Sequence, residues 1–275
     1  MNKRLYIYLF LFALTLIGIT ANYNLHVVAL NIPSIEKRDL RVLTWNVHCP
    51  KGTDSICQTR IAELIIHEDA DFIQLNEFYQ DSCAILDDIL KKHYPYTEEN
   101  QSHQRCGDIF YSRTPMSNSG HVIVPVVGNY IQTLKATIPV KEDSVQLFGC
   151  HMASNGGIEG DVKSLYERYQ EVQQKRCHQA SWTKYHIEQA VHPVIVMGDM
   201  NDFSFSAPLD TLKSCGIKDA WWNGGNGYGA TYHDGWIRLR IDYILYNEKL
   251  KVLQTRVVET DLSDHNPIIA DFKLK

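Results

Sequence analysis

Short apolar runs recur along the chain from residue 40 onward and predict the strands of a β-rich domain. The first run, at 40–47, is apolar along most of its length, which is typical of a buried strand. Similar runs bounded by turn residues predict further strands at 71–75, 109–112, 121–127, 130–138, 145–150, 194–197, 240–246 and 268–272. The pattern therefore places strands over most of the chain.

Apolar side chains at helical spacing predict two helices between these strands. Ile61, Leu64 and Ile65 predict one ahead of the strand at 71–75, and a second, longer helix is predicted from about Val162 toward Gln189. We assign the cationic side chains of the longer helix to its solvated face: Lys163, Lys175 and Arg176. Strands and helices mixed in this order predict an α/β sandwich of sheets covered by helices.

The N-terminal segment has a different pattern. Lys3 and Arg4 precede an uncharged, mostly apolar run at 5–21, which is typical of an export signal peptide or a membrane anchor. With the basic pair on the cytoplasmic side, the remainder would face outward. We therefore expect a signal peptide or anchor (1–21), a polar link (22–39) and one domain (40–275). The domain would be exported and either anchored facing outward, in the periplasm if the source is bacterial, or secreted.

Composition agrees with one domain and limits its partners. A chain of 275 residues that is 44% hydrophobic can form one large domain with a buried core, and we expect a monomer. The net charge is −5, or −7 without Lys3 and Arg4, so binding of nucleic acid would need local patches or metal ions. Seven cysteines are compatible with a few disulfides and at least one free thiol, and no CxxC pair suggests structural zinc.

Polar residues gather next to the ends of five predicted strands. A single polar residue there is commonly a turn former or a helix cap. Five such positions together point to a site, because strand ends and their loops are where a rigid scaffold presents catalytic groups. The residues are Asn46, Glu77, His151, Asp199 with Asn201, and Asp264 with His265.

These residue types fit the hydrolysis of a phosphate ester. Mg²⁺ takes oxygen ligands from one or two carboxylates, for which Glu77 and Asp264 are suited. Asp199 can orient or deprotonate the attacking water, with Asn201 holding the geometry through its amide. A cationic imidazole then stabilises charge on the phosphate, and a neighbouring carboxylate keeps it protonated. For this last role the sequence offers His265 and Asp242.

Six short motifs resemble, in order, those of the endonuclease/exonuclease/phosphatase superfamily, which includes deoxyribonuclease I, apurinic endonucleases, inositol polyphosphate 5-phosphatases and neutral sphingomyelinases. GDMN and SDHNP with IDY between them form a specific set, whereas WNV or NE alone would be weak. The resemblance runs from about residue 40 to 272. The motifs are TWNV (44–47), QLNE (74–77), YSRTP (111–115), GDMN (198–201), RIDY (240–243) and SDHNP (263–267).

The resemblance implies a four-layered α/β sandwich, with two packed mixed β-sheets flanked by helices and the site at one end of the sheets. It implies a metal, Mg²⁺ or alternatively Mn²⁺, and it assigns roles by motif. Asn46, Glu77 and Asp264 would lie at the metal, Asp199 and Asn201 would handle the nucleophile, Asp242 and His265 would form a dyad, and His151 would contact the phosphate or protonate the leaving oxygen.

Two further residues remain open. Apurinic endonucleases resemble one another in carrying an acid two positions after the first asparagine, where this chain has His48. His48 is either part of the site or a surface polar residue. Asp108 either supports His151 or belongs to a turn with Gly107.

The sequence thus predicts a metal-dependent hydrolase of phosphate esters. Its substrate would be a lipid headgroup, a small phosphoester or a nucleic acid. The lack of a Lys/Arg cluster slightly favours the first two classes, although deoxyribonuclease-like members can also be acidic. The alternative is a non-catalytic, membrane-tethered binding module that retains the fold, for which the catalytic residue types would serve no purpose.

Overall fold

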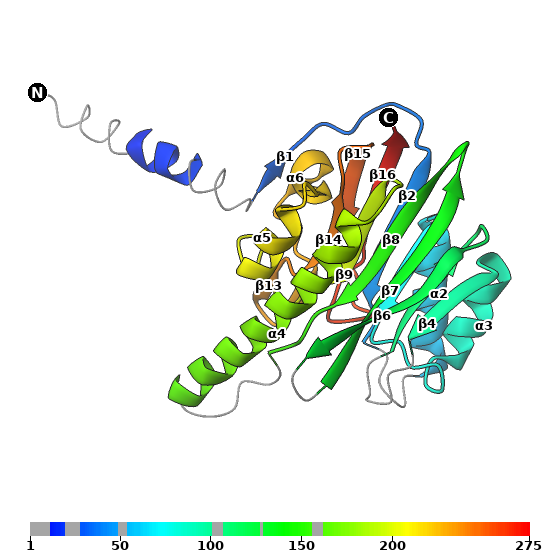
Figure 1. The fold of residues 1–275 in the computed structure, drawn as a ribbon, viewed down its shortest axis with the longest axis horizontal. Helices are drawn as coiled ribbons and strands as arrows, with labels where there is room; N and C mark the ends of the chain where they lie inside the picture. The colour runs from blue at the N-terminus through cyan, green and yellow to red at the C-terminus, as the bar shows by residue number, and fades with distance from the viewer. Residues whose placement is uncertain (1–11, 20–27, 49–53, 101–106, 127–128, 156–161) are drawn as a thin grey trace, which may run out of the picture.

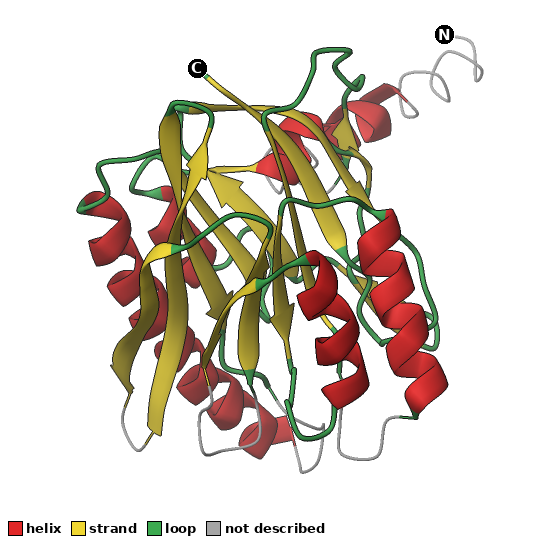
Figure 2. Cartoon of the chain, turned by 90° about the vertical axis from the view of Figure 1, so that its right-hand side faces the viewer, coloured by secondary structure: helices red, strands yellow, loops and turns green. Residues whose placement is uncertain are grey.

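Two six-stranded β-sheets pack against each other, with helices on their outer faces (Figure 1, Figure 2). The computed structural model describes residues 12–19, 28–48, 54–100, 107–126, 129–155 and 162–275. Apolar side chains of both sheets form the central core, including Val42, Phe72, Leu147 and Ile195. This arrangement confirms the predicted four-layered sandwich.

The first sheet is mixed and contributes β2 and β3 to the site. β2 pairs in parallel with β3, and the other neighbours pair antiparallel. Helices α2 (Ser55–His67) and α3 (Ala84–His93) cover its outer face through a second apolar cluster. In order, the strands are β15 (Leu250–Val257), β16 (Ile268–Leu274), β2 (Leu40–Asn46), β3 (Phe72–Asn76), β5 (Asp108–Ser112) and β4 (Tyr96–Asn100).

The second sheet contributes β8, β9 and β14 to the site. β8 pairs in parallel with β9, while the remaining pairs are antiparallel. Helices α4 (Val162–Glu188) and α5 (Ala207–Lys213) cover its outer face, and α6 (Ala220–Gly224) follows β10. In order, the strands are β10 (Lys218–Asp219), β14 (Asp242–Tyr246), β9 (Val194–Asp199), β8 (Asp143–His151), β7 (Asn129–Val140) and β6 (Ser117–Val126).

The nine strands predicted from apolar runs are all present, with ends shifted by a few residues. Some elements were not predicted. β15 was not predicted because a register shift between Val252 and Gln254 breaks its alternation of buried and exposed residues. α3 was not predicted because its apolar stripe is short and is interrupted by Asp87, whose side chain is buried against Tyr111.

The described part of the predicted link lies along the domain. β1 (Ala29–Leu30) pairs antiparallel with β11 (Asn226–Gly227), and Ala29 is buried. The backbone N–H of Ser34 donates to the carbonyl of Leu253 at 3.1 Å. Residues 28–39 therefore pack against the domain although their sequence is irregular; residues 22–27 lie outside the described residues.

Of the predicted signal peptide or anchor, residues 12–19 are described. They are helical and their apolar side chains are exposed, as for Phe12, Ile17 and Ile19. Positions 1–11, 20 and 21 lie outside the described residues. Within the described ranges, no helix combines the length and the apolar character that crossing a membrane requires.

The five described cysteines fall into two classes, and Cys49 and Cys106 lie outside the described residues. Cys83 is disulfide-bonded. Free thiols are present at Cys57, Cys150, Cys177 and Cys215.

Gly198, at the end of β9, has no room for a side chain. Its φ is +129°, and a Cβ atom would lie 1.9 Å from the carbonyl oxygen of Cys150 in β8. Gly216 also has a positive φ, +84°, but open space around it. We expect Gly198→Ala to lower the free energy of unfolding by at least about 2 kcal/mol more than Gly216→Ala, because only the former adds a clash to backbone strain. Chemical denaturation measures both; equal losses would contradict the close approach of β8 and β9.

Candidate active site

The strands that end in polar residues meet at one end of the two sheets. In the parallel pair β2 and β3, Asn46 lies opposite Asn76. In the parallel pair β8 and β9, His151 lies opposite Asp199, and Asp199 also lies opposite Asp242 of β14. Because parallel strands end at the same edge, side chains from distant parts of the chain converge there.

Glu77 lies among nitrogen atoms from three neighbours. The Asn46 Nδ2 donates to Glu77 Oε1 at 3.0 Å and to Asp199 Oδ2 at 3.1 Å. The Nδ1 of His48 lies 2.9 Å from the other oxygen, Oε2, and the Nε2 of His151 lies 3.9 Å from Oε1. Asn46 therefore links the carboxylates of the two sheets.

The surroundings of Glu77 favour its ionised form. Burial raises the pKa of Glu77, but the hydrogen bond from Asn46, the positive charge of His151 and the hydrogen bond with His48 outweigh burial and hold that pKa below its ordinary value. The carboxylate is therefore charged at neutral pH.

His151 is held by a buried acid. Its Nδ1 lies 3.3 Å from Asp108 Oδ1, which also accepts a hydrogen bond from the Asn76 amide at 2.7 Å. Burial lowers the pKa of His151, but Asp108 and then Asp199 and Glu77 raise it to about 10. His151 is thus a cation at neutral pH, and Asp108 lies where it can support His151.

Asp199 is a buried carboxylate between the two histidines. Its exposed fraction is 1%. Burial and the nearby charge of Asp242 raise the pKa of Asp199 to about 6, against the opposite effect of His265 and His151. A carboxylate with this pKa is a stronger base than an ordinary aspartate and is still ionised at neutral pH.

Asn201 fixes the loop that follows Asp199. Its backbone N–H donates to Asp199 Oδ1 at 2.8 Å, and its Nδ2 donates to the Met152 carbonyl at 3.0 Å. The backbone of Asn201 is left-handed, with φ of +52°. Glu77 and His48 share this uncommon conformation, at +52° and +36°, so three loops of the site hold non-glycine residues under backbone strain.

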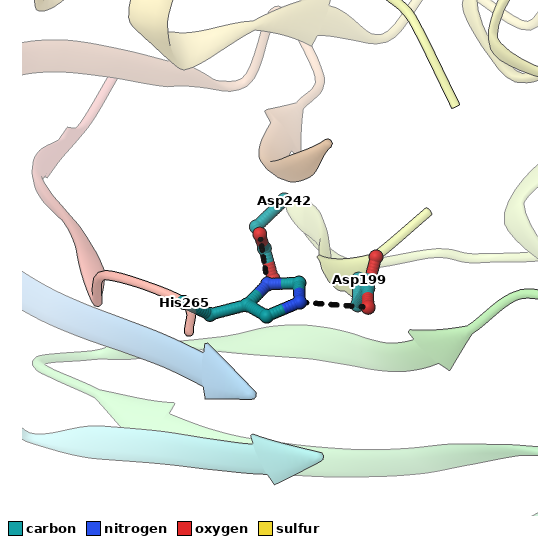
Figure 3. Close-up of side chains that lie close together, drawn as sticks. All are labelled: Asp199, Asp242 and His265. Carbon is teal, nitrogen blue, oxygen red and sulfur yellow. Dashed lines mark hydrogen bonds and ion pairs between the residues drawn. The ribbon is translucent and has the colours of Figure 1, made fainter. Parts of the chain in front are cut away.

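His265 and Asp242 form a hydrogen-bonded pair, shown with Asp199 in Figure 3. The Nδ1 of His265 lies 2.8 Å from Asp242 Oδ2, and its Nε2 lies 3.8 Å from Asp199 Oδ2. Burial lowers the pKa of His265, but Asp242 raises it to about 9, so the imidazole is cationic at neutral pH. The Thr231 hydroxyl accepts the backbone N–H of Asp242 at 3.0 Å and fixes the start of β14.

Asp264 lies on the loop that carries His265. The Ser263 hydroxyl lies 3.3 Å from Asp264 Oδ1 and 2.8 Å from the carbonyl oxygen of Asn46, which ties this loop to the end of β2. The ring of Tyr232 packs edge-on against His265, with centroids 5.1 Å apart. The predicted site residues thus lie in one connected group at the ends of β2, β3, β8, β9 and β14.

Comparison with known proteins identifies the family. The model of the endonuclease/exonuclease/phosphatase family matches residues 43–265. The chain belongs to this family. This confirms the predicted resemblance and supports hydrolysis of phosphate esters in general. No curated protein gave a match.

Solved structures agree with the family's fold. A family protein from Bacteroides vulgatus is 18% identical, with 86% of this chain and 99% of that one covered and a TM-score of 0.67. Truncated TDP2 from Caenorhabditis elegans is 16% identical, with 85% of this chain and 97% of that one covered and a TM-score of 0.65. A 3' phosphatase, NExo from Neisseria bound to a product DNA hairpin, is 16% identical, with 85% of this chain and 99% of that one covered and a TM-score of 0.65. At these identities the likeness concerns the fold.

Two places in the site of this family member differ in how well they could bind a divalent cation: the cluster around His265 and the carboxylate of Glu77. Asp199, Asp242 and His265 each offer one ligand atom, all within 4.8 Å of one another. All three are buried, however, and one ring nitrogen of His265 is already hydrogen-bonded to Asp242. The Glu77 side chain is ionised and 26% exposed, so a cation can reach it from solvent. The residues present therefore fit a cation at Glu77 and a hydrogen-bonded dyad at His265.

The assignment of Arg176 to the solvated face of α4 was wrong. Arg176 is 1% exposed; it donates to the Ala153 carbonyl at 2.7 Å and pairs with Asp202 at 3.2 Å. One turn later, the Gln179 amide accepts from the Ala153 N–H and donates to the His151 carbonyl. These two residues of the family member brace the loops that follow β8 and β9. Only their helical spacing of three could have indicated a shared face.

Proposed function

We propose that the protein is a metal-dependent phosphoesterase that uses a water oriented by Asp199. The observation that supports this most is the convergence of an ionised glutamate, a basic aspartate and two cationic histidines at one end of the sheets. Each has a charge or basicity that phosphate ester hydrolysis requires. The group consists of Glu77, Asp199, His151 and His265.

Asp199 accepts the proton of the attacking water. With a pKa of about 6 it is ionised at neutral pH and basic enough to draw a proton from water as the oxygen attacks phosphorus. The backbone N–H of Asn201 binds the second carboxylate oxygen and so holds the basic oxygen in one direction.

The two histidines bind and neutralise the phosphate. His265, kept cationic by Asp242, presents its Nε2 3.8 Å from Asp199, and His151, kept cationic by Asp108, presents its Nε2 3.9 Å from Glu77. Cationic N–H donors in a largely buried site stabilise the negative charge that develops on the phosphoryl oxygens. Either imidazolium can also give its proton to the leaving oxygen.

Glu77 would hold the cation, with Asn46 and Asp264 beside it. A bound divalent ion would act as a Lewis acid on the phosphoryl group. Mg²⁺ fits carboxylate oxygens, and Mn²⁺ accepts the same ligands, while the Asn46 amide N–H holds the Glu77 carboxylate in place. The charged, partly exposed carboxylate of Glu77 supports this placement.

For the substrate we propose a small phosphoester or a lipid headgroup ahead of nucleic acid. The net charge is −5. Two arginines near the site loops are buried in ion pairs: Arg176, which donates to the Ala153 carbonyl, pairs with Asp202, and Arg240, two residues before Asp242, pairs with Asp219. These arginines are therefore not available to a polynucleotide backbone. That a structural neighbour holds a DNA hairpin keeps a nuclease as the second candidate.

We further propose an exported monomer, either anchored facing outward through residues 1–21 or secreted. The exposed apolar side chains of residues 12–19 support a segment made for a membrane or an export machinery. A non-catalytic, membrane-tethered module is the rival proposal. The strained loops and shifted pKa values of the site weigh against it, because a module would gain nothing from them.

A substrate panel tests the proposed function. The purified protein is assayed with Mg²⁺ or Mn²⁺ on plasmid DNA, phosphoinositides, sphingomyelin and a chromogenic phosphodiester. We expect turnover of at least one substrate, and loss of this turnover when the ion is chelated. The variant His265→Ala should also lose turnover. The control His192→Ala should keep it, because His192 is a surface residue whose ion-pair partner is the exposed Asp143. If all four substrates stay intact with both ions, the enzyme proposal is wrong.

A further inference from the structure

His48 and Glu77 face each other at the mouth of the site. The Nδ1 of His48 lies 2.9 Å from Glu77 Oε2, and the two side chains are 52% and 26% exposed. An ion approaching from solvent can therefore reach both atoms. The pair lies on the side of Glu77 away from Oε1, which is turned toward Asn46 and His151.

Because the Asn46 amide turns its N–H group toward Glu77, the nearest nitrogen to Glu77 that could bind a cation is the Nδ1 of His48. Asn46 Nδ2 faces two carboxylates, Glu77 and Asp199, while its Oδ1 accepts the backbone N–H of His48 at 3.0 Å. These partners fix which amide atom is oxygen, because carboxylates accept and an N–H donates. Asn46 thus presents an N–H group, which cannot bind a cation, to Glu77, and its oxygen holds the backbone of His48.

The spacing of the His48 and Glu77 atoms is that of two ligands of one ion. Ligands at right angles around an octahedral cation, each about 2.1 Å from it, lie about 3 Å apart. The 2.9 Å between Nδ1 and Oε2 matches this. Both residues have left-handed backbones, with φ of +36° and +52°, which aim the two side chains at each other at the cost of strain.

We propose that His48 is a ligand of the divalent cation together with Glu77, and that this nitrogen ligand shifts the site's preference from Mg²⁺ toward Mn²⁺. The inference rests on the proposed metal-dependent function. The ion takes the place of the hydrogen bond between His48 Nδ1 and Glu77 Oε2, and Nδ1 binds the ion through its lone pair. Mg²⁺ strongly prefers oxygen ligands, whereas imidazole suits transition metals. An imidazole ligand therefore weakens the binding of Mg²⁺ relative to the binding of Mn²⁺.

Metal binding to the full chain tests this without an activity assay. The electron paramagnetic resonance signal of free Mn²⁺ gives its affinity, competition with Mg²⁺ gives the ratio of the two affinities, and pulsed measurements detect a nitrogen bonded to bound Mn²⁺. The variants are His48→Asn, His48→Asp and, as a control, His67→Asn, which removes a more exposed histidine on α2.

We expect a directly bonded nitrogen in the wild type and in His67→Asn, and none in His48→Asn. His48→Asp should lower the preference for Mn²⁺ over Mg²⁺ roughly tenfold, because it replaces the nitrogen ligand with an oxygen ligand. The inference is overturned if the nitrogen signal persists in His48→Asn or if the affinity ratio is the same in all variants; His48 then only pairs with Glu77. A wild type that binds neither ion would overturn the metal-dependent function as well, which separates the two failures.

Discussion

Asp199→Asn is expected to lower kcat by about 10²–10⁴-fold, because it removes the proposed base while keeping the size of the side chain. The amide oxygen can still accept the N–H of Asn201, so the loop keeps its geometry. The raised pKa of Asp199 means that the fold disfavours its ionised form, and stability is lost as pH rises through about 6. The unfolding midpoint at neutral pH should therefore not fall, and steady-state kinetics with thermal denaturation check both results.

The matched control is Asp210→Asn on α5, whose side chain is 66% exposed. It changes the net charge by the same amount away from the site, and its kcat should stay at the wild-type value. If Asp199→Asn retained full turnover, another group would have to accept the proton, and the role given to Asp199 would be lost.

Asp242→Asn is expected to lower kcat by about 10²–10⁴-fold through its effect on His265. Burial lowers the pKa of His265, and Asp242, followed by Asp199 and Asp264, raises it to about 9. Without the Asp242 carboxylate the largest raising contribution is lost, so this pKa should fall. The alkaline limb of the kcat profile should therefore move to lower pH.

Measuring the pKa of His265 by nuclear magnetic resonance separates this effect from unfolding, because a purely structural role for Asp242 would lower stability without moving that pKa. Asp242→Asn and Asp199→Asn should also be non-additive, since Asp199 lies 3.8 Å from the Nε2 of the same imidazole. Full additivity, or an unchanged pKa of His265, would contradict the dyad.

The site divides into two halves, one from each sheet, that meet at Asn46. Glu77 follows β3 of the first sheet, whereas Asp199 is the last residue of β9 in the second. The Asn46 amide donates to both carboxylates at 3.0 and 3.1 Å. The packing of the two sheets therefore sets the distance between Glu77, the proposed metal ligand, and Asp199, the proposed base.

Local patterns determined much of this protein. Apolar runs predicted the strand at 40–47 and the long helix toward Gln189, because burial of a strand or a helix face leaves a period in the sequence. The motifs around Asn46, Asp199 and His265 predicted the family and the fold, both of which are confirmed. The same residues were predicted as a site because polar types recur at strand ends, which is again a local signal.

Only the tertiary structure decided which of these residues meet, because that depends on sheet pairing between distant segments. The parallel pairing of β2 with β3 and of β8 with β9 brings their ends together, and no local period encodes it. The contact of His48 with Glu77 and the burial of Arg176 against Asp202 also depend on side-chain direction and on neighbours far along the chain. Local sequence patterns therefore indicated the site residue types and most of the core strands, and the packing of the sheets made these residues one site.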